Sequence, residues 1–195
     1  TPDYSEAAKF SDLWVHPTQG TDSALAMALG HVIAREFHVE RQVPYFTDYV
    51  RKYTDMPMLV RLVESDGRLI PERFVRASDL EGALGETANP EWKTLAFDEN
   101  SDEIVAPCGS VGYRWDDTGK WNLEEKDGNG RATKLRLSLA EIRDEVAEVA
   151  FPYFGNREHD HFTGTDHPDV LIRKVPVMRL SLTDGEVLAA SVYDL

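Results

Sequence analysis

The sequence Trp14–Asp22, WVHPTQGTD, leads directly into Ser23–Phe37, SALAMALGHVIAREF. This order of residue types predicts a short strand at 13–15, a turn that contains glycine, and a long helix. Such a turn leaves the first backbone N–H groups of the helix unpaired, and the helix dipole has its positive end there. Both features suit a phosphate or pyrophosphate. We therefore expect a nucleotide-type site in the first part of the chain.

Three residues of this turn are candidates for contact with a cofactor. Gly20 lets the backbone approach a phosphate closely, and Thr21 can cap the helix and donate its hydroxyl to a phosphate oxygen. The Asp22 carboxylate repels a phosphate, but it accepts hydrogen bonds well from guanine N1–H and N2–H2 or from ribose hydroxyls. We expect Asp22 to contact the base or the sugar. The alternative stays open that it complements the helix dipole, an effect of about 0.3–1 kcal/mol.

Asp3 is the fourth candidate. In doubly wound sheets, ligands lie outside the carboxyl ends of the strands, and an acidic residue there often accepts hydrogen bonds from ribose hydroxyls. The first residues, TPDYS at 1–5, include no initiator methionine and are typical of a turn after a strand. We therefore expect the chain to be a piece of a longer protein. The alternative is that Asp3, with Ser5, caps a short helix at 6–10.

The sequence predicts an α/β fold in three parts. Residues 1 to about 63 are expected to form part of a Rossmann-like doubly wound layer, 64–174 a loop-rich α+β insertion with β-hairpins, and 175–195 a closing β-hairpin. Apolar side chains recur at helical spacing in the long helix, namely Leu25, Leu29, Val32, Ile33 and Phe37. This helix is therefore expected to bury one face on a sheet.

Local signals predict the remaining elements. A second helix at 45–53 is expected to end before Pro57, which disfavours helical geometry at the preceding residue, and a strand follows at 58–63. Further predictions are turns at 66–67, 100–102 and 127–130, strands at 94–97 and 111–115, a helix at 78–84 capped by Ser78, and a helix at 140–149. Asp184-Gly185 predicts a tight turn between strands at 175–182 and 187–193.

Charge and composition exclude several classes of function. The net charge is -14, with 35 acidic and 21 basic residues, which argues against nucleic-acid or anionic-membrane partners, because both need clustered Lys and Arg. The single cysteine, Cys108, allows no intramolecular disulfide and no self-contained cysteine metal site. No apolar stretch approaches the ~20 residues of a membrane-spanning helix. We expect a soluble segment without direct membrane insertion.

A group of histidines resembles a metal site by residue type. His159, Asp160, His161 and His167 lie close together in sequence, and imidazoles and carboxylates at such spacing can bind zinc or a non-haem metal. They occur in a polar, glycine-containing segment, where a solvated arrangement is the better interpretation. We assign them no role.

Beyond these local features, the chain resembles a known family. The order TPDYS at 1–5, DLW at 12–14 and QGTD at 19–22 resembles molybdopterin oxidoreductases, and specifically the catalytic alpha subunits of respiratory nitrate reductases. The turn QGTD is a family-wide feature, usually with proline in place of Gln19. Further matches occur in order at 45–51, 53–60, 89–94, 119–124, 151–155 and 192–195. They span nearly the whole chain.

This resemblance implies an internal piece of a much longer subunit that reduces nitrate to nitrite. Such a subunit carries molybdenum on two molybdopterin guanine dinucleotides (bis-MGD) and a [4Fe-4S] cluster, whose ligands come from segments upstream of this one. Only Asp3, Gly20, Thr21 and Asp22 match positions that contact the guanine end of one cofactor. The implied partners are the remainder of the alpha subunit, an iron-sulfur beta subunit and a membrane gamma subunit, which hold the enzyme at the cytoplasmic side of the membrane.

Two alternatives remain open on the sequence. The first is a related molybdoenzyme that oxidises nitrite or reduces chlorate or selenate, because substrate choice depends on residues near the metal that are absent here. The second is a non-catalytic nucleotide-binding or interaction module. If the chain is a piece of a nitrate reductase alpha subunit, the isolated segment is expected to be inactive, because the metal ligands lie elsewhere.

Overall fold

The computed structural model describes residues 4–41, 43–80, 84, 89–107, 125–142, 144–152 and 170–195. The chain divides into two compact units, Thr1–Asp48 and Tyr49–Leu195. The division into 1–63, 64–174 and 175–195 stays a prediction.

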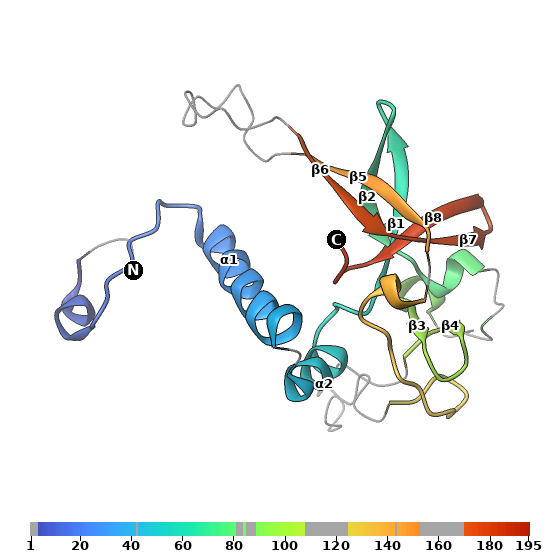
Figure 1. Ribbon diagram of the computed structural model, residues 1–195, viewed down its shortest axis with the longest axis horizontal. Helices are drawn as coiled ribbons and strands as arrows, with labels where there is room; N and C mark the ends of the chain where they lie inside the picture. The colour runs from blue at the N-terminus through green and yellow to red at the C-terminus, as the bar shows by residue number, and fades with distance from the viewer. Residues whose placement is uncertain are drawn as a thin grey trace. The chain divides into compact units, whose positions relative to one another are not determined.

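The first unit is helical where the sequence predicts it. A short 3-10 helix, η1, spans Glu6–Phe10, α1 spans Asp22–Ala34, and a π-helical segment, η2, continues it over Arg35–Glu40. The second predicted helix is α2, Pro44–Tyr53 (Figure 1). Proline fits at the first position of α2 because it has no backbone N–H, and an N–H at that position would find no acceptor within the helix. The predicted helices at 23–37 and 45–53 are therefore confirmed in position.

Two expectations for this unit are not met. Residues 13–15 belong to no strand, because a strand needs a ladder partner and no described residue pairs with them. Helix α1 buries no residue among the described ones, so the predicted packing of one face on a sheet is not confirmed. The chain is mixed α/β as predicted, but a Rossmann-like wound layer is not confirmed.

The second unit is built on a six-stranded mixed sheet (Figure 1). Its strands are β1 Leu59–Ser65, β2 Arg68–Phe74, β5 Val146–Pro152, β6 Val170–Pro176, β7 Met178–Leu182 and β8 Gly185–Ser191. Their order across the sheet is β6-β5-β2-β1-β8-β7. All neighbours are antiparallel except β2 and β5, which are parallel. The strand predicted at 58–63 is confirmed as β1.

Smaller elements complete the described part of this unit. A two-stranded sheet pairs β3, Ala96–Asp98, with β4, Glu103–Val105. Three 3-10 helices accompany it, η3 Ala77–Leu80, η4 Pro90–Trp92 and η5 Leu139–Glu141. The turn predicted at 100–102 joins β3 to β4, and the strand predicted at 94–97 overlaps β3. The strand predicted at 111–115 lies outside the described residues.

Turn chemistry explains why the hairpins form where they do. Asp66 and Gly67 have φ angles of 51° and 73° between β1 and β2, the paired positive values of a tight two-residue hairpin turn. Gly185 has a φ of 126° at the start of β8. The closing hairpin is confirmed over β7 and β8. Residues 170–176 instead pair with β5, and the chain changes partner after Pro176, which has no backbone N–H for a ladder.

Two predicted helices differ from the structure in position or type. The helix predicted at 78–84 overlaps the single 3-10 turn η3, Ala77–Leu80, and its residues 81–83 lie outside the described part of the chain. The Asp79 carboxylate accepts a hydrogen bond from the backbone amide of Arg76 at 2.9 Å. The segment expected to be a helix at 140–149 contains η5 and then β5. Its β-branched residues suit a strand as well as a helix, and a strand forms because β5 pairs along its length with β6.

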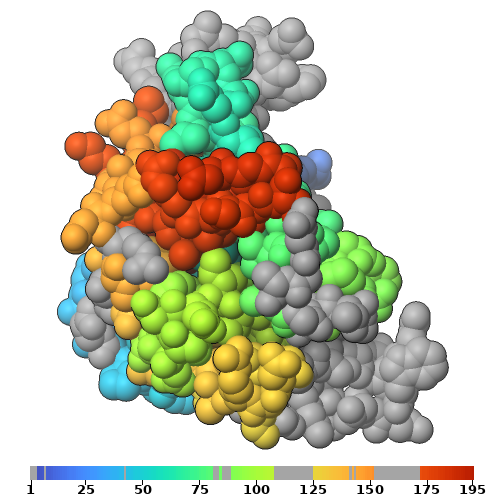
Figure 2. All heavy atoms as spheres, turned by 90° about the vertical axis from the view of Figure 1, so that its right-hand side faces the viewer, coloured from blue at the N-terminus to red at the C-terminus, as the bar shows by residue number. Residues whose placement is uncertain are grey.

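The core of the second unit lies between the β7–β8 hairpin and the β3–β4 segment. Figure 2 shows the red surface that includes this hairpin directly above the yellow-green β3–β4 segment. Leu59, Leu95 and Ala189 are 0% exposed there and pack with side chains from both elements. A second cluster joins β5, β6 and β8 through Val149, Val175 and Ala190. The unit therefore buries apolar side chains on its own.

Candidate functional site

The turn before α1 is held by hydrogen bonds within itself. The backbone N–H of Thr21 donates to the carbonyl of Thr18 at 3.1 Å, and the Thr21 hydroxyl donates to the same oxygen at 2.6 Å. Gly20 has a φ of 80°, which a residue with a Cβ adopts only with strain. Apart from Gly20 and its two chain neighbours, no atom of the described residues lies within 4 Å of the place that a Cβ on Gly20 would occupy. The glycine is therefore required by the backbone conformation, and its outer side is open.

The start of α1 presents backbone donors. The carbonyl of Thr21 accepts the first helical hydrogen bond, from the N–H of Leu25 at 3.1 Å. Thr21 makes no side-chain cap, because its hydroxyl donates back into the turn. Within the part of the chain that the structure describes, the amides of 22–24 have no acceptor. These donors and the positive end of the dipole meet at one place.

The predicted site residues are contiguous where they can be placed. Gly20 and Asp22 are exposed and Thr21 is half-buried, so the Asp22 carboxylate lies in the first turn of α1 and is accessible. Asp3 lies outside the described residues. The structure therefore brings together three of the four predicted residues, by their adjacency in sequence.

Aromatic contacts beside this turn were not predicted. The ring of Trp14 lies edge-on to Tyr4, with centroids 5.2 Å apart, and 5.1 Å from the ring of His16. These contacts connect the residues just after Asp3 with the segment that leads into the turn. No spacing in the sequence signals the contact between Tyr4 and Trp14, because these two rings come from different short segments.

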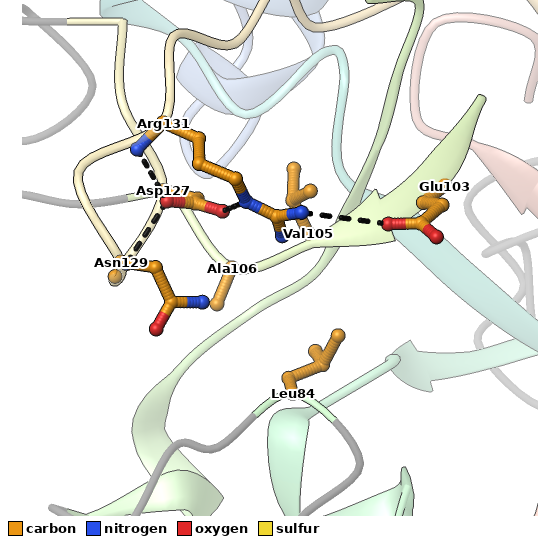
Figure 3. Close-up of a pocket in the computed structure, with 8 residues that line it drawn as sticks. Leu84, Glu103, Val105, Ala106, Asp127, Asn129 and Arg131 are labelled. Atoms are coloured by element: carbon orange, nitrogen blue, oxygen red, sulfur yellow. Dashed lines mark hydrogen bonds and ion pairs between the residues drawn. The ribbon is translucent and has the colours of Figure 1, made fainter. Parts of the chain in front are cut away.

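A separate hollow of about 100 Å³ lies in the second unit (Figure 3). Figure 3 shows Arg131 directed toward Asp127 on one side and Glu103 on the other. The Nε of Arg131 donates to Oδ2 of Asp127 at 2.7 Å, and its Nη1 lies 3.9 Å from Oε2 of Glu103. Leu84 lies apart from these polar groups.

The carboxylate in this hollow is occupied by its own turn. Oδ1 of Asp127 accepts from the amides of Asn129 and Arg131 at 2.9 and 2.8 Å. Desolvation opposes the charged form, but the hydrogen bonds from Arg131 and Asn129 outweigh it and lower the pKa of Asp127. The group is thus an ionised acceptor that holds the turn 127–131, and it is a poor general base.

Asp79 has a similar structural role. Its two carboxylate oxygens accept from Nη1 and Nη2 of Arg73 at 2.8 and 2.9 Å. The hydrogen bond from Arg73 is the main reason that the pKa of Asp79 is lowered, and the amide of Arg76 adds to it. Such a bidentate pair is strong and directional. It fixes η3 to β2.

Among the described residues, no group of three or more His, Cys, Asp or Glu side chains is arranged to hold a metal ion. Cys108, His159, His161 and His167 lie outside the described part of the chain. None of the helices described is long and apolar enough to cross a membrane.

Comparison with known proteins adds a relationship that geometry alone does not give. Over its full length the chain is 56% identical to the "Respiratory nitrate reductase 1 alpha chain" of Escherichia coli (strain K12). It is 38% identical over its full length to the "Nitrate reductase alpha chain" of Bacillus subtilis (strain 168). The chain is a relative of nitrate reductase alpha chains. The resemblance drawn from the sequence is confirmed.

The relationship to nitrate reductase alpha chains covers all of this chain but a small part of theirs. The chain spans 16% of the E. coli protein and 15% of the B. subtilis protein. The "Perchlorate reductase subunit alpha" of Dechloromonas aromatica (strain RCB) is 37% identical over 79 residues, which is 40% of this chain. No protein-family model matches the chain.

Proposed function

We propose that these residues belong to a molybdenum-dependent nitrate reductase alpha chain and that residues 20–22, with Asp3, help to hold the guanine-nucleotide end of a molybdopterin cofactor. The observation that carries the proposal is the 56% identity to a nitrate reductase alpha chain along the full length. When bound, the cofactor supplies the molybdenum at which an oxygen atom is taken from nitrate. The segment itself binds and orients.

The donor set at the start of α1 fits a nucleotide tail. Amides 22–24 and the helix dipole favour an anionic phosphate, and the open side of Gly20 lets a phosphate approach the backbone. The Thr21 hydroxyl is engaged with Thr18, so Thr21 contributes chiefly by holding the turn, and its oxygen remains available as an acceptor. Asp22 supplies an accessible carboxylate for guanine or ribose.

The remaining cofactors and subunits of the proposed enzyme lie outside this segment. We place the second cofactor of the bis-MGD pair, the [4Fe-4S] cluster and the ligands of both metals in other parts of the alpha chain. An iron-sulfur beta subunit would pass electrons to it, and a membrane gamma subunit would hold it at the cytoplasmic side of the membrane. The expected Rossmann-like layer would be completed by the same missing parts of the alpha chain.

A second candidate is a related oxyanion reductase, favoured by the match to a perchlorate reductase alpha subunit. That match covers 40% of the chain, whereas the match to nitrate reductases covers all of it. Nitrate is therefore the preferred substrate of the proposal. The two candidates differ in which oxyanion the full-length enzyme reduces fastest.

The site is tested by Asp22→Ala in the full-length enzyme. Losing one or two hydrogen bonds to a charged acceptor, at about 1.5–3 kcal/mol each, weakens retention of the guanine nucleotide by roughly tenfold to a hundredfold or more. The measurement is guanosine monophosphate released per alpha chain after acid hydrolysis, together with nitrite formed from nitrate. Asp144→Ala is the matched control, because Asp144 is also exposed and lies in the second unit.

Wild-type nucleotide content in the Asp22→Ala enzyme would reject the assigned role of Asp22. A full-length enzyme with bound nucleotide that reduced chlorate or perchlorate but no nitrate would instead favour the second candidate.

A further inference from the structure

Strand β7 forms an edge of the six-stranded sheet, since β8 is its one neighbour among the described strands (Figure 1). Both ends of this edge are closed by other parts of the second unit. The N–H of Val177 donates to the carbonyl of Glu145 at 3.0 Å, and the N–H of Thr183 donates to the carbonyl of Asp79 at 2.9 Å. The amides of 177 and 183 therefore point away from β8.

The middle of this edge is open. Backbone groups of successive strand residues point to opposite sides, so the N–H and C=O of Arg179 and Ser181 face the same way as the amides of 177 and 183. Within the part of the chain that the structure describes, these groups have no hydrogen-bond partner. The Arg179 guanidinium is paired with the Glu145 carboxylate, so its charge does not guard the edge. Residues 178–182, which we call the β7 edge, thus offer two donors and two acceptors to an extended chain.

A hollow of about 440 Å³ lies beside the β7 edge, between β7 and β4. Its apolar lining includes Leu80, Ile104 and Met178. Figure 2 shows the red surface that includes β7 above the yellow-green segment that includes β4. Met178 and Leu180 point to the β3–β4 side of the sheet, where they join the core. Alternate side chains of a strand added to β7 would therefore lie over the hollow.

The rim of the hollow is acidic. Asp102 and Glu103 line it and are exposed. No described residue pairs with the Asp102 carboxylate, and Oε2 of Glu103 lies 3.9 Å from Nη1 of Arg131, at the limit of an ion pair. The cation that lines the hollow, Arg179, is already paired with Glu145. A positively charged ligand therefore meets an unpaired carboxylate, and the net charge of -14 adds to the attraction.

We propose that the β7 edge and the hollow beside it bind an extended, basic peptide segment of another protein. The segment adds a strand to β7 through the backbone groups of 179 and 181, places apolar side chains over the hollow, and meets Asp102 with a Lys or Arg side chain. In this mode of recognition, main-chain hydrogen bonds supply the affinity and pockets for alternate side chains supply the selectivity. The site lies wholly in the second unit, so it is independent of the proposed nucleotide site.

Two other occupants fit this site less well. A small molecule would leave part of the edge unmatched, because the outward groups of 179 and 181 are about 7 Å apart along the strand. A second copy of the chain would pair two β7 edges, each beside an unpaired Asp102 carboxylate and each on a chain of net charge -14, and like charges oppose association. An extended basic segment satisfies both the backbone groups and the carboxylate.

The first test is saturation-transfer NMR on the full-length enzyme, with the acetylated and amidated peptide Lys-Val-Thr-Val-Lys as the probe. The peptide Glu-Val-Thr-Val-Glu is the matched control, because it keeps the length and the strand propensity and reverses the charge. We expect the basic peptide to bind with a dissociation constant in the millimolar range or below. The acidic peptide should bind at least about tenfold more weakly.

N-methylation of the basic peptide tests the strand geometry itself. One derivative is methylated at both valine amides and the other at the threonine amide. A strand added at one edge pairs only its alternate amides with β7. We therefore expect one derivative to bind about fivefold more weakly and the other to bind like the unmethylated peptide. Equal weakening in both derivatives, or in neither, would overturn the proposal.

Two variants of the enzyme locate the bound peptide. Ser181→Pro removes an outward N–H and leaves the ladder with β8, because proline is tolerated at an edge where the N–H faces away. Asp102→Asn removes the carboxylate, and Asp66→Asn is its matched control, since both aspartates are exposed turn residues with φ angles of 58° and 51°, which asparagine also adopts. We expect Ser181→Pro to weaken binding about fivefold, Asp102→Asn about twofold to fivefold, and Asp66→Asn not at all.

The contrary results each overturn the proposal. Lack of binding to the wild-type enzyme would mean that another segment of the parent covers the β7 edge. A dimer of alpha chains that Ser181→Pro converts to monomers would mean that a second copy occupies it. Equal effects of Asp102→Asn and Asp66→Asn would mean that the peptide responds only to net charge. If Ser181→Pro lowers the yield of folded enzyme, the methylated peptides and the two aspartate variants decide the question.

Discussion

Asp98→Ala offers the sharpest test of what holds the β3–β4 segment together. Asp98 is 1% exposed, yet its carboxylate accepts hydrogen bonds from three residues. Oδ1 accepts from the amides of Asn100 at 3.3 Å and Lys134 at 2.6 Å. Oδ2 accepts from the amide and hydroxyl of Ser101 at 3.0 and 2.7 Å. One side chain therefore fixes the β3–β4 turn and the passing strand-like segment at 134–136.

The expected magnitude follows from which donors can find water. Asn100 and Ser101 are exposed, so their donors can be resolvated after the substitution and recover part of the lost energy. Taking the equivalent of one to two bonds to a charged acceptor as lost, at roughly 1.5–3 kcal/mol each, Asp98→Ala lowers the free energy of unfolding by about 1.5–6 kcal/mol. Asp98→Asn turns an amide donor toward one pair of donors and is also destabilising.

The assay is urea unfolding of the 195-residue chain, followed by far-ultraviolet circular dichroism. Asp144→Ala serves as the control, because an exposed carboxylate away from such contacts changes stability by less than about 0.5 kcal/mol. If Asp98→Ala also stayed within about 0.5 kcal/mol of wild type, the hydrogen bonds of this carboxylate would not stabilise the fold and the argument would fail.

Two further predictions concern the second unit. Arg73 lowers the pKa of Asp79 in the folded state. The stability that this pair contributes is therefore present above the unfolded pKa of about 3.9 and is lost as the pH falls through the folded pKa. The melting temperature of Asp79→Asn should vary less between pH 5 and pH 2 than that of wild type, and equal pH dependence of the two melting temperatures would refute the assignment. Gly185→Ala should lower the free energy of unfolding by about 1–3 kcal/mol, because a φ of 126° strains any residue with a Cβ. The space around the added methyl group is open in the described structure, so the strain comes from the backbone alone. Glu186→Ala, next to it, should be nearly neutral in the same denaturation experiment.

Features set by a few neighbouring residues were predictable from the sequence. Asp66-Gly67 and Asp184-Gly185 specify tight turns, since their backbone angles depend on local sterics alone. The second helix ends at Tyr53, before Pro57, as an equally local signal predicts. The predicted starts of α1 and α2 and the closing hairpin all rest on signals of this kind.

Features set by distant partners were not predictable. The spacing of Ile142, Val146 and Val149 is compatible with a helix, yet Val149 is buried against Val175 because β5 pairs with β6. Residues 13–15 have the composition of a strand but no ladder partner among the described residues. The presence of a distant pairing partner decides the first case, and the lack of one among the described residues decides the second.

The part of the candidate site that is contiguous in sequence was predictable, and the part that depends on distant residues was not. Gly20, Thr21 and Asp22 are adjacent, so the sequence alone places them at the start of α1. The hollow at Asp127, Arg131 and Glu103 was missed, because Glu103 comes from β4 and reaches the turn only through the fold. The turn at 127–130 was its one visible signal.

The measurement that tests the central claim most directly is the guanine nucleotide content of the full-length enzyme with Asp22→Glu. Glutamate keeps the negative charge at the start of α1, so a role limited to the helix dipole would leave both stability and nucleotide content unchanged. Because the carboxylate is displaced by one methylene, we predict that the variant folds with wild-type stability but retains markedly less guanosine monophosphate per chain. Nucleotide content equal to that of wild type would contradict recognition of the cofactor by Asp22.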